Sequence, residues 1–418
     1  MLQLLLLAVM AGNVLAGDFT VKIRPRQTMT YPTPFEIPTL AQTPQEWMDA
    51  LSAATAAGKI PNIAPAQLVD GNPVYANNAG FDSSTCSWTV TKCTGSNDIV
   101  NAPPHQMAVG FDDGPTENSG DLYGFLSQVN QSATHYMIGS NVYSYPQQFA
   151  QAVAEGNQHF AVHTWSHHLC STLTNQQLVA ELGWTMQIIA DKSGGYIPKF
   201  WRPPQGDIDN RVRAIAEEIF GLTVVIWNKD TNDWCLQDDG TSACPGEDPG
   251  KDYASVAAAA SAGINGPQQN GLIMLEHELT HQSIKVFKDY YPQLKGLGWT
   301  PNNVADVFNM PWYKNAWDNE QTPQKGGVLD TFTLGASPSP DDSSSSTTAT
   351  ASSTSKTSAP SSSAPTSTHS ASTRSGSASA PQKTSKQSIT TNGAAGFGPA
   401  SFGIAGLASI AAIVASLL

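Results

Sequence analysis

The chain has 418 residues, a length that could hold two or three domains, but its composition changes sharply along the sequence, which favours one large domain. Its formal net charge is −13 at pH 7. This charge argues against a nucleic-acid partner, which would require a basic face, and no obligate protein partner is evident.

The first residues, MLQLLLLAVMAGNVLAG, are an apolar run followed by small side chains. Val14 and Ala16 stand at the positions that signal peptidase reads before its cleavage site. The run is shorter than the about 20 apolar residues that cross a bilayer, and it lacks the usual positive start. We predict that residues 1–16 are a signal peptide and that the mature protein is secreted.

Residues 17–101 are predicted to form an N-terminal extension packed on the main domain. Pro and Thr are frequent in its first part. Only the stretch PQEWMDALSAATAAG has the pattern of a helix, and Gly58 is expected to end it.

The five cysteines are expected to pair mostly with one another, because secretion places them in an oxidising compartment. Their short separations favour the pairs Cys86–Cys93 and Cys235–Cys244 and leave Cys170 over. The spacing alone does not establish this connectivity, so Cys170 is either a buried thiol or a member of a different disulfide.

From residue 102 to residue 317, apolar runs with strand character alternate with helical stretches. The strand candidates are HQMAVGF, ATHYMIG, HFAVHT, LTVVIW and GLIMLEH. The helix candidates between them are SGDLYGFLSQVN, NQQLVAELGWTMQIIADKSG and DNRVRAIAEEIFG. This alternation predicts a parallel sheet of βα units with both faces covered. Polar residues follow the strand candidates, at the sheet edge where α/β proteins bind ligands.

Residues 318–392 are predicted to be a stalk rich in Ser, Thr and Pro. Ser and Thr make up more than half of residues 341–390, and this segment has no aromatic residue, so it cannot build a core. We expect O-glycosylation of the stalk. We also expect N-glycosylation at Asn130, which begins an Asn-Gln-Ser sequence.

The C-terminus has the order of a glycosylphosphatidylinositol (GPI) anchor signal. Asn392, Gly393 and Ala394 are small residues, a weakly polar spacer follows, and residues 402–418 form an apolar tail. We predict anchor attachment at Asn392 and removal of residues 393–418. The protein would then lie on the outer leaflet of the cell membrane, held by its GPI anchor, or in the cell wall. A short transmembrane tail is the alternative.

Two adjacent aspartates occur in the stretch VGFDDGPTEN. Neighbouring strand residues point to opposite faces, so Asp112 and Asp113 can serve one site only if the strand ends there. Gly114-Pro115 is expected to end it. An Asx turn or a helix cap is the alternative.

Three histidines lie close together in the stretch AVHTWSHHLC. On a helical turn, His163 and His167 would share a face with room for one cation, and His168 would point about 100° away. One carboxylate with two imidazoles leaves an open position for water, which is the pattern of catalytic zinc, and a second carboxylate can act as a base. Solvated polar residues on an ordinary helix are the alternative.

Five motifs of this chain resemble those of the polysaccharide deacetylases, the carbohydrate esterase family that contains the chitin deacetylases. They are FDDGP, HTWSH, RPPQGDIDNRV, DTNDW and LIMLEHEL, and they follow the family's order from residue 111 to residue 279. The resemblance implies an α/β fold, a distorted (β/α) barrel, for residues 102–317. It also implies one divalent metal, Zn²⁺ or Co²⁺, and the removal of N-acetyl groups from chitin or its oligomers.

The resemblance also implies the residues of the metal site and of proton transfer. Asp113, His163 and His167 would hold the metal. Asp112 would act as the general base on the attacking water. His277 would act as the general acid toward the leaving amine.

Five further residues would support this centre according to the resemblance. Arg202 would orient the general base, and Asp233 would hold the imidazole of the general acid. Trp234 and Leu275 would line the pocket for the acetyl methyl group. A main-chain N–H near Gln205 would meet the oxyanion. Taken singly, each residue has an ordinary alternative, such as a surface position for Arg202 or a core position for Trp234.

The chain departs from the family's pattern at three positions. Gly110 stands where Thr or Ser is usual, Gln205 where an aromatic residue is common, and Glu276 where many fungal members have Thr. The negative charges of Glu276 and Glu278 beside His277 are expected to favour its protonated form, which suits a general acid. Gln205 puts sugar stacking at that position in doubt.

Two other functions remain open from the sequence. The first is an esterase that acts on O-acetylated polysaccharide with the same chemistry. The second is a non-catalytic wall or effector protein that binds chitin through the same groove. The complete set of acid, base and metal residues argues against the second.

Overall fold

The structure is a computed structural model, and it describes residues 30–335. The predictions for the signal peptide, for the stalk beyond residue 335, and for Asn392 and residues 393–418 lie outside the described residues. Within the described range, residues 30–69 and 73–332 form one unit, and residues 70–72 and 333–335 belong to another. No helix in this range is long and apolar enough to cross a membrane.

The strands are short. They are β1 (Gln67–Val69), β2 (Asn72–Val74), β3 (Gln106–Ala108), β4 (Gly110–Gly114), β5 (Thr134–Met137), β6 (His159–Val162), β7 (Phe200–Trp201), β8 (Thr223–Val224), β9 (Lys229–Asp230), β10 (Met274–Leu275) and β11 (Thr300–Asn302). The α-helices are α1 (Gln45–Ala56), α2 (Trp88–Thr91), α3 (Ser119–Gln128), α4 (Gly139–Ser144), α5 (Pro146–Glu155), α6 (Asn175–Lys192), α7 (Asn210–Phe220), α8 (Tyr253–Ile264), α9 (His281–Tyr290) and α10 (Val304–Val307).

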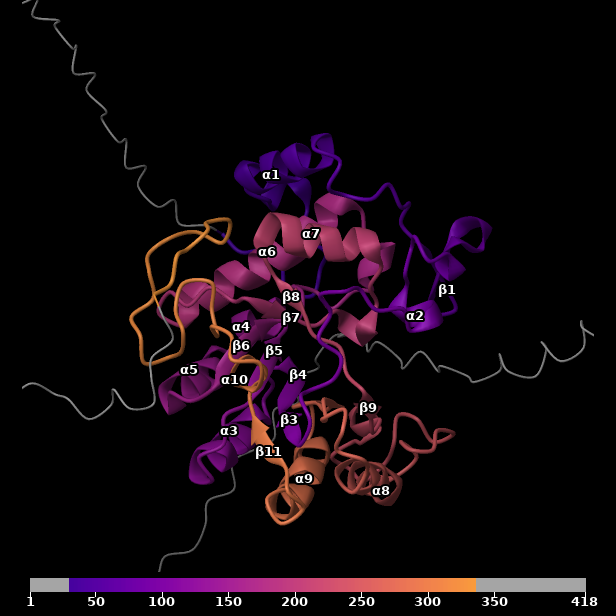
Figure 1. The fold of residues 1–418 in the computed structure, drawn as a ribbon, viewed down its shortest axis with the longest axis vertical. Helices are drawn as coiled ribbons and strands as arrows, with labels where there is room; N and C mark the ends of the chain where they lie inside the picture. Colours follow the sequence, from indigo (N-terminus) through magenta and orange to yellow (C-terminus); the bar gives the residue numbers. More distant parts are fainter. Residues whose placement is uncertain (1–29, 336–418) are drawn as a thin grey trace, which may run out of the picture. The chain divides into compact units, whose positions relative to one another are not determined.

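A five-stranded parallel sheet lies at the centre of the first unit, in the order β4-β5-β6-β7-β8. The chain continues from β8 into β9, which pairs in parallel with β10. An isolated bridge between Asp112 and His277 then joins the chain after β10 back to β4. The strands therefore follow one another around a common apolar core, with helices outside them (Figure 1). This arrangement confirms the predicted α/β fold, a distorted (β/α) barrel.

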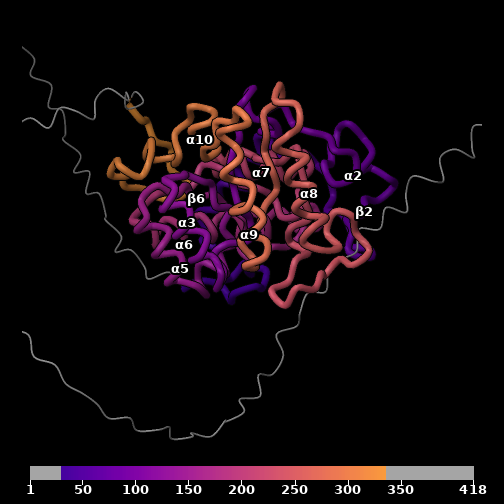
Figure 2. Tube along the Cα trace, turned by 90° about the horizontal axis from the view of Figure 1, so that it is seen from below, coloured from indigo at the N-terminus to yellow at the C-terminus, as the bar shows by residue number. Residues whose placement is uncertain are grey.

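The helices cover the strands in neighbouring pairs. α6 packs on α7, and α3 packs on α5. α8 and α9 lie side by side in both views (Figures 1 and 2). The sequence of α7 explains such packing, because its buried residues Val212, Ile215, Ala216 and Ile219 follow a helical period and form one apolar stripe.

The N-terminal extension packs against the barrel at two glycines. Helix α1, which matches the predicted helix, contacts α6 and α7 (Figure 1). Its Trp47 lies against Gly183, where an added Cβ would come 2.5 Å from the indole ring. Trp88 of α2 covers Gly206 in the same way, at 2.4 Å from an added Cβ. Both glycines therefore leave room for an aromatic ring of the extension.

The cysteines pair as their spacing favours. The structure contains the disulfides Cys86–Cys93 and Cys235–Cys244. Cys170 is buried and forms no disulfide, so of the two alternatives the buried thiol is correct.

Several segments differ from the expectations drawn from the sequence. β7 and the helices α5, α8 and α9 were not predicted. Residues 318–332, which composition assigned to the stalk, contact the rest of the first unit. Val328 is buried, and the Asn319 side-chain amide donates to the carbonyl oxygen of Gln158 at 2.6 Å. The folded part therefore extends past residue 317, because a few long-range contacts hold a segment that has no strong pattern of its own.

Candidate metal and catalytic site

Asp112 and Asp113 lie within β4, and a bulge allows both to serve one site. The register of β4 against β5 shifts between Asp112 and Gly114, and Asp113 has a φ of 71°, in the left-handed region. Such a bulge redirects side chains that would otherwise alternate between the two faces. β4 ends at Gly114, as the Gly114-Pro115 pair predicted, and the bulge inside its last residues was not predicted.

His163 and His167 lie in a loop that follows β6, so the helical turn considered from their spacing is not formed. The N–H of His163 donates to the carbonyl oxygen of Met137 at 2.9 Å and extends the pairing with β5. Thr164 and His167 then have φ values of 65° and 61°, and the His167 N–H donates to the Thr164 hydroxyl at 3.1 Å. The irregular loop, and not a helical face, brings the two imidazoles together.

Three potential ligand atoms converge at the ends of β4 and β6. One atom each from Asp113, His163 and His167 lies within 4.8 Å of the other two. The Nε2 atoms of His163 and His167 are 3.3 Å and 3.1 Å from Oδ1 of Asp113. That buried oxygen nevertheless has no hydrogen-bond partner among the described residues. An unpartnered carboxylate oxygen that faces two imidazole nitrogens fits a divalent metal site.

Hydrogen bonding of the first histidine supports this fit. Nδ1 of His163 lies 2.7 Å from the carbonyl oxygen of Arg202, which can only accept. Nδ1 therefore carries the proton, and Nε2 keeps the lone pair that a metal ligand needs. Burial acts to raise the pKa of Asp113, but the neighbouring His167 and His163 hold it well below its usual range. The carboxylate is thus ionised, as a metal ligand must be.

Arg202 holds the second aspartate. Its guanidinium donates from Nη1 to Oδ1 of Asp112 at 2.6 Å, and both side chains are buried. The ring of Tyr136 lies 4.0 Å below the guanidinium carbon. Because Arg202 occupies Oδ1, the other oxygen of Asp112 remains available, and this Oδ2 lies 3.7 Å from Nε2 of His163.

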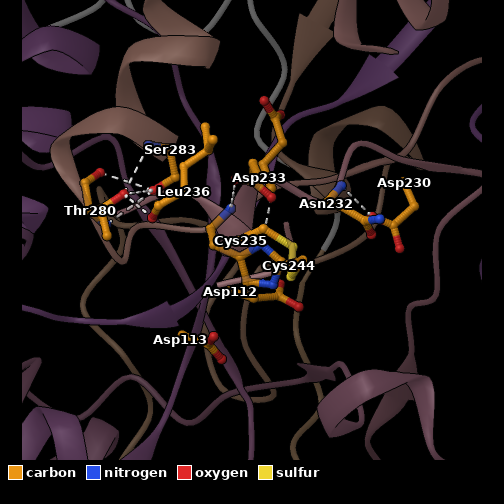
Figure 3. A network of polar contacts seen from close by, with 12 residues as sticks. Asp112, Asp113, Asp230, Asn232, Asp233, Cys235, Leu236, Cys244, Thr280 and Ser283 are labelled. Carbon is orange, nitrogen blue, oxygen red and sulfur yellow. Dashed lines mark hydrogen bonds and ion pairs between the residues drawn. A yellow bond between two sulfur atoms is a disulfide. The ribbon is translucent and has the colours of Figure 1, made fainter. Parts of the chain in front are cut away.

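Asp233 holds both the backbone N–H and the imidazole ring of His277. The Asp233 carboxylate accepts from the His277 backbone N–H at 2.8 Å and contacts Nδ1 at 2.7 Å. Burial would lower the pKa of His277, but the Asp233 charge outweighs it and raises the pKa to about 10. Figure 3 shows Asp233 near Asp112 and Asp113, with the Cys235–Cys244 disulfide directly after it. His277 is therefore fixed in orientation beside the two aspartates, and Asp233 favours its charged form.

The expected source of this protonation needs a correction. Glu276 accepts from the Tyr290 hydroxyl at 2.7 Å, and Oε1 of Glu278 contacts Nδ1 of His135 at 3.0 Å. The two glutamates flank His277 in sequence but are engaged elsewhere. The main charge that raises the pKa of His277 is Asp233.

Gln205, Trp234 and Leu275 lie close along the chain to this centre. Gln205 is exposed at the tip of a 3₁₀ turn, with a φ of 55°, three residues after Arg202. Trp234 is half-buried and directly follows Asp233. Leu275 is buried in β10. Their roles toward a substrate stay predictions.

One buried carboxylate near the candidate metal ligands was not predicted from the sequence. Glu181 of α6 accepts from the N–H of Trp165 and of Ser166, inside the histidine loop. The available signal was a single acid in the apolar run LVAELGW. Asn130, the predicted glycosylation acceptor, is exposed after α3, and its modification stays a prediction.

Comparison with known proteins identifies relatives of this chain. A family model described as polysaccharide deacetylase matches residues 100–225. Chitin deacetylase 3 of Cryptococcus neoformans var. neoformans serotype D is 44% identical over 290 residues, which are 68% of this chain and 67% of the relative. The chitin deacetylase of Amylomyces rouxii is 33% identical over 333 residues, which are 72% of this chain and 75% of the relative.

A solved structure with a similar arrangement is the chitin deacetylase from the fungal pathogen Colletotrichum lindemuthianum. It is 20% identical, with a TM-score of 0.46, and the match covers 52% of this chain and 95% of that one. The two sequence relatives, matched over two thirds or more of their length, carry the assignment to a family.

Proposed function

The chain belongs to the polysaccharide deacetylase family, and on this premise we propose that it removes N-acetyl groups from the N-acetylglucosamine units of chitin. Water cleaves the acetamide bond, and the products are acetate and a glucosamine unit. The observation that carries the proposal is the unpartnered Oδ1 of Asp113, which faces two imidazoles beside an aspartate held by an arginine. The names of the two relatives support chitin as the substrate.

The metal would be held by Asp113, His163 and His167. A divalent ion there, Zn²⁺ or Co²⁺, supplies Lewis acidity toward the acetamide carbonyl and the attacking water. Three protein ligands would leave a position open, as in catalytic metal sites. The family resemblance and the donor set of one carboxylate and two imidazoles support this assignment.

Asp112 would accept a proton from the attacking water. Arg202 holds Oδ1 at 2.6 Å, so the proton goes to Oδ2, the oxygen on the side of His163. The water oxygen forms a bond to the acetyl carbon while the carbonyl oxygen takes up negative charge. A main-chain N–H near Gln205 would donate to that oxygen.

His277 would complete the cleavage. Its Nε2–H protonates the amide nitrogen as the bond from carbon to nitrogen breaks, so the sugar leaves as a neutral amine. Asp233 holds Nδ1 at 2.7 Å, which leaves Nε2 as the nitrogen that would donate, and its charge raises the pKa of His277 so that the ring is charged at neutral pH. Trp234 and Leu275 would enclose the acetyl methyl group.

The experiment that tests this function is mass spectrometry of defined chitin oligomers after incubation with the full secreted chain. Each deacetylation should remove one acetyl group and release one acetate. Chelation should abolish the reaction, and Zn²⁺ or Co²⁺ should restore it. Full activity in metal-free protein contradicts the metal assignment, whereas release of acetate from O-acetylated polysaccharide alone supports the esterase alternative.

We further propose secretion and a GPI anchor attached at Asn392, on the sequence pattern of both ends of the chain. The two disulfides are compatible with an extracellular protein. Phosphatidylinositol-specific phospholipase should release the protein from membranes unless it has already passed to the cell wall. Recovery of residues 402–418 in the mature protein contradicts the anchor.

A further inference from the structure

Residues 163–167 form the ligand loop, which carries two of the three proposed metal ligands. Its backbone is unusual. Thr164 and His167 both have φ values above 60°, a region that residues other than glycine seldom adopt. Such conformations persist only where surrounding groups hold them, and they are frequent at functional sites. The groups that hold this loop therefore determine where His163 and His167 point.

The carbonyl groups of the loop are held by the start of α4. The N–H of Gly139 donates to the Thr164 carbonyl at 2.9 Å, and the Ser140 hydroxyl donates to the Trp165 carbonyl at 2.6 Å. Gly139 permits this approach, because an added Cβ would come 2.5 Å from the Trp165 ring. One side of the loop is thus fixed by donors.

The amide groups of the loop are held by Glu181 of α6. Its Oε2 accepts from the N–H of Trp165 at 2.7 Å and of Ser166 at 2.8 Å. Its Oε1 accepts from the Ser166 hydroxyl at 2.5 Å. An ionised carboxylate has about four acceptor positions, so one side chain can hold two consecutive amides and a hydroxyl. The second side of the loop is thus fixed by a single acceptor.

Glu181 lies in an unfavourable place for a carboxyl group. It is fully buried on a helix whose neighbouring residues Val179, Ala180 and Leu182 are also buried. Burial raises its pKa to about 7, against the opposing effect of the hydrogen bonds from Ser166 and Trp165. A buried carboxyl group is costly unless its hydrogen bonds are made, and here all those bonds go to the ligand loop.

We propose that Glu181 is a positioning residue for the metal site. By holding the amides of Trp165 and Ser166, it fixes the loop so that His163 and His167 direct their Nε2 atoms at the metal. The inference rests on the proposed function only in taking these histidines as ligands. The two histidines are then preorganised in the metal-free protein, and this preorganisation contributes to metal affinity.

The test measures Zn²⁺ affinity of the metal-free full chain by competition with a chromophoric chelator. Glu181→Ala removes every acceptor and should weaken Zn²⁺ binding by about 10- to 100-fold, the usual effect of residues behind metal ligands. Glu181→Gln keeps an oxygen for the two amides, and Ser166→Ala removes only the hydroxyl. Both should weaken Zn²⁺ binding less than Glu181→Ala does, so Glu181→Gln restores most of the affinity.

Asp209→Asn is the matched control. This buried carboxylate caps α7, accepting from the Val212 N–H at 2.8 Å and from the Tyr75 hydroxyl at 3.1 Å. The Asp209 carboxylate makes no hydrogen bond to the ligand loop. Asp209→Asn should therefore lower the unfolding temperature and leave the Zn²⁺ affinity unchanged. The comparison separates a general loss of stability from a specific loss of affinity.

Unchanged Zn²⁺ affinity in folded Glu181→Ala overturns the proposal, because a purely structural glutamate would affect only the unfolding temperature. If that variant does not fold, Glu181→Gln and Ser166→Ala decide, and wild-type affinity in both overturns it. No step of this measurement uses chitin. If the wild-type chain is inactive on chitin oligomers, the proposed function is contradicted. If Glu181→Ala nevertheless weakens Zn²⁺ binding, the inference is still supported.

Discussion

A buried histidine lies at each end of β6, His159 as its first residue and His163 directly after its last, and the two have opposite surroundings. His159, at the amino end, contacts the Thr134 hydroxyl through Nδ1 at 3.1 Å and the Trp312 carbonyl through Nε2 at 2.9 Å. The hydroxyl can donate to Nδ1, while Nε2–H donates to the carbonyl. Every polar group of this ring is therefore satisfied by the neutral form.

His163 begins the loop after the same strand and is buried to the same degree. Its Nδ1 has a partner in the Arg202 carbonyl, but its Nε2 faces the unpartnered Oδ1 of Asp113. Burial alone does not distinguish the two residues. The number of ring nitrogens without a hydrogen-bond partner does, and this difference separates a histidine that stabilises the fold from one that is available for chemistry.

Parallel substitutions at the two histidines test this comparison most directly. His163→Gln removes a ligand nitrogen, so metal content and acetate release should both fall to background. His159→Gln should retain both, because it lies at the other end of the strand. Metal analysis and an acetate assay on the two purified variants decide the matter. Metal loss in His159→Gln, or full metal content in His163→Gln, contradicts the distinction.

The two aspartates of the bulge sharpen the comparison within the carboxyl end. Asp112→Asn keeps the shape of the side chain but cannot take the proton of water. It should bind metal while turnover falls by roughly 10²–10⁴-fold, the usual contribution of a general base. Asp113→Ala, the paired variant, should lose metal and activity together. The opposite pattern, with metal lost in Asp112→Asn and kept in Asp113→Ala, would exchange the two roles.

Stability measurements test the amino end. His159→Leu leaves the Trp312 carbonyl without its donor and the Thr134 hydroxyl without its acceptor. The free energy of unfolding should fall by about 1–3 kcal/mol, the cost of a buried polar group without a partner. Urea denaturation of the metal-free protein measures this loss. A variant as stable as the wild type would show that these hydrogen bonds contribute nothing to the fold.

The pH dependence of stability is a second test of the amino end. Burial lowers the pKa of His159 from 6.5 to about 3, so the unfolded chain binds this proton more readily than the folded chain. The contribution is fully present above pH 6.5 and is lost as the pH falls from there toward 3. Thermal unfolding should therefore depend less on pH in His159→Gln than in the wild type. Equal slopes in this window contradict the neutral assignment.

The side chains that meet at the candidate site could be predicted from the sequence, because each proposed role admits few residue types. A metal and a general base require carboxylates and imidazoles, and Asp112, Asp113 and His277 stand in motifs whose order alone is informative. The alternating apolar runs likewise predicted the parallel sheet, since both faces of its strands are buried. These features depend on residues that are close together or regularly spaced in the sequence, so the sequence alone can predict them.

The local geometry could not be predicted, because distant partners determine it. The bulge at Asp113 depends on pairing with β5, and the loop at His163 depends on the carbonyls of Met137 and Arg202. Spacing suggested a helical turn, but these long-range bonds impose another conformation. Glu181 escaped notice for a similar reason, since its partners lie 15 and 16 residues away in sequence.

The packing of the N-terminal extension on Gly183 and Gly206 determines how much of the chain the folded domain needs. The family model begins at residue 100, yet the rings of Trp47 and Trp88 fill the hollows above Gly183 and Gly206 from outside that boundary. A gene fragment cut at the family boundary would encode a barrel with two open hollows, one of them beside the Arg202 motif. The minimal fragment for expression or for domain exchange therefore begins before α1.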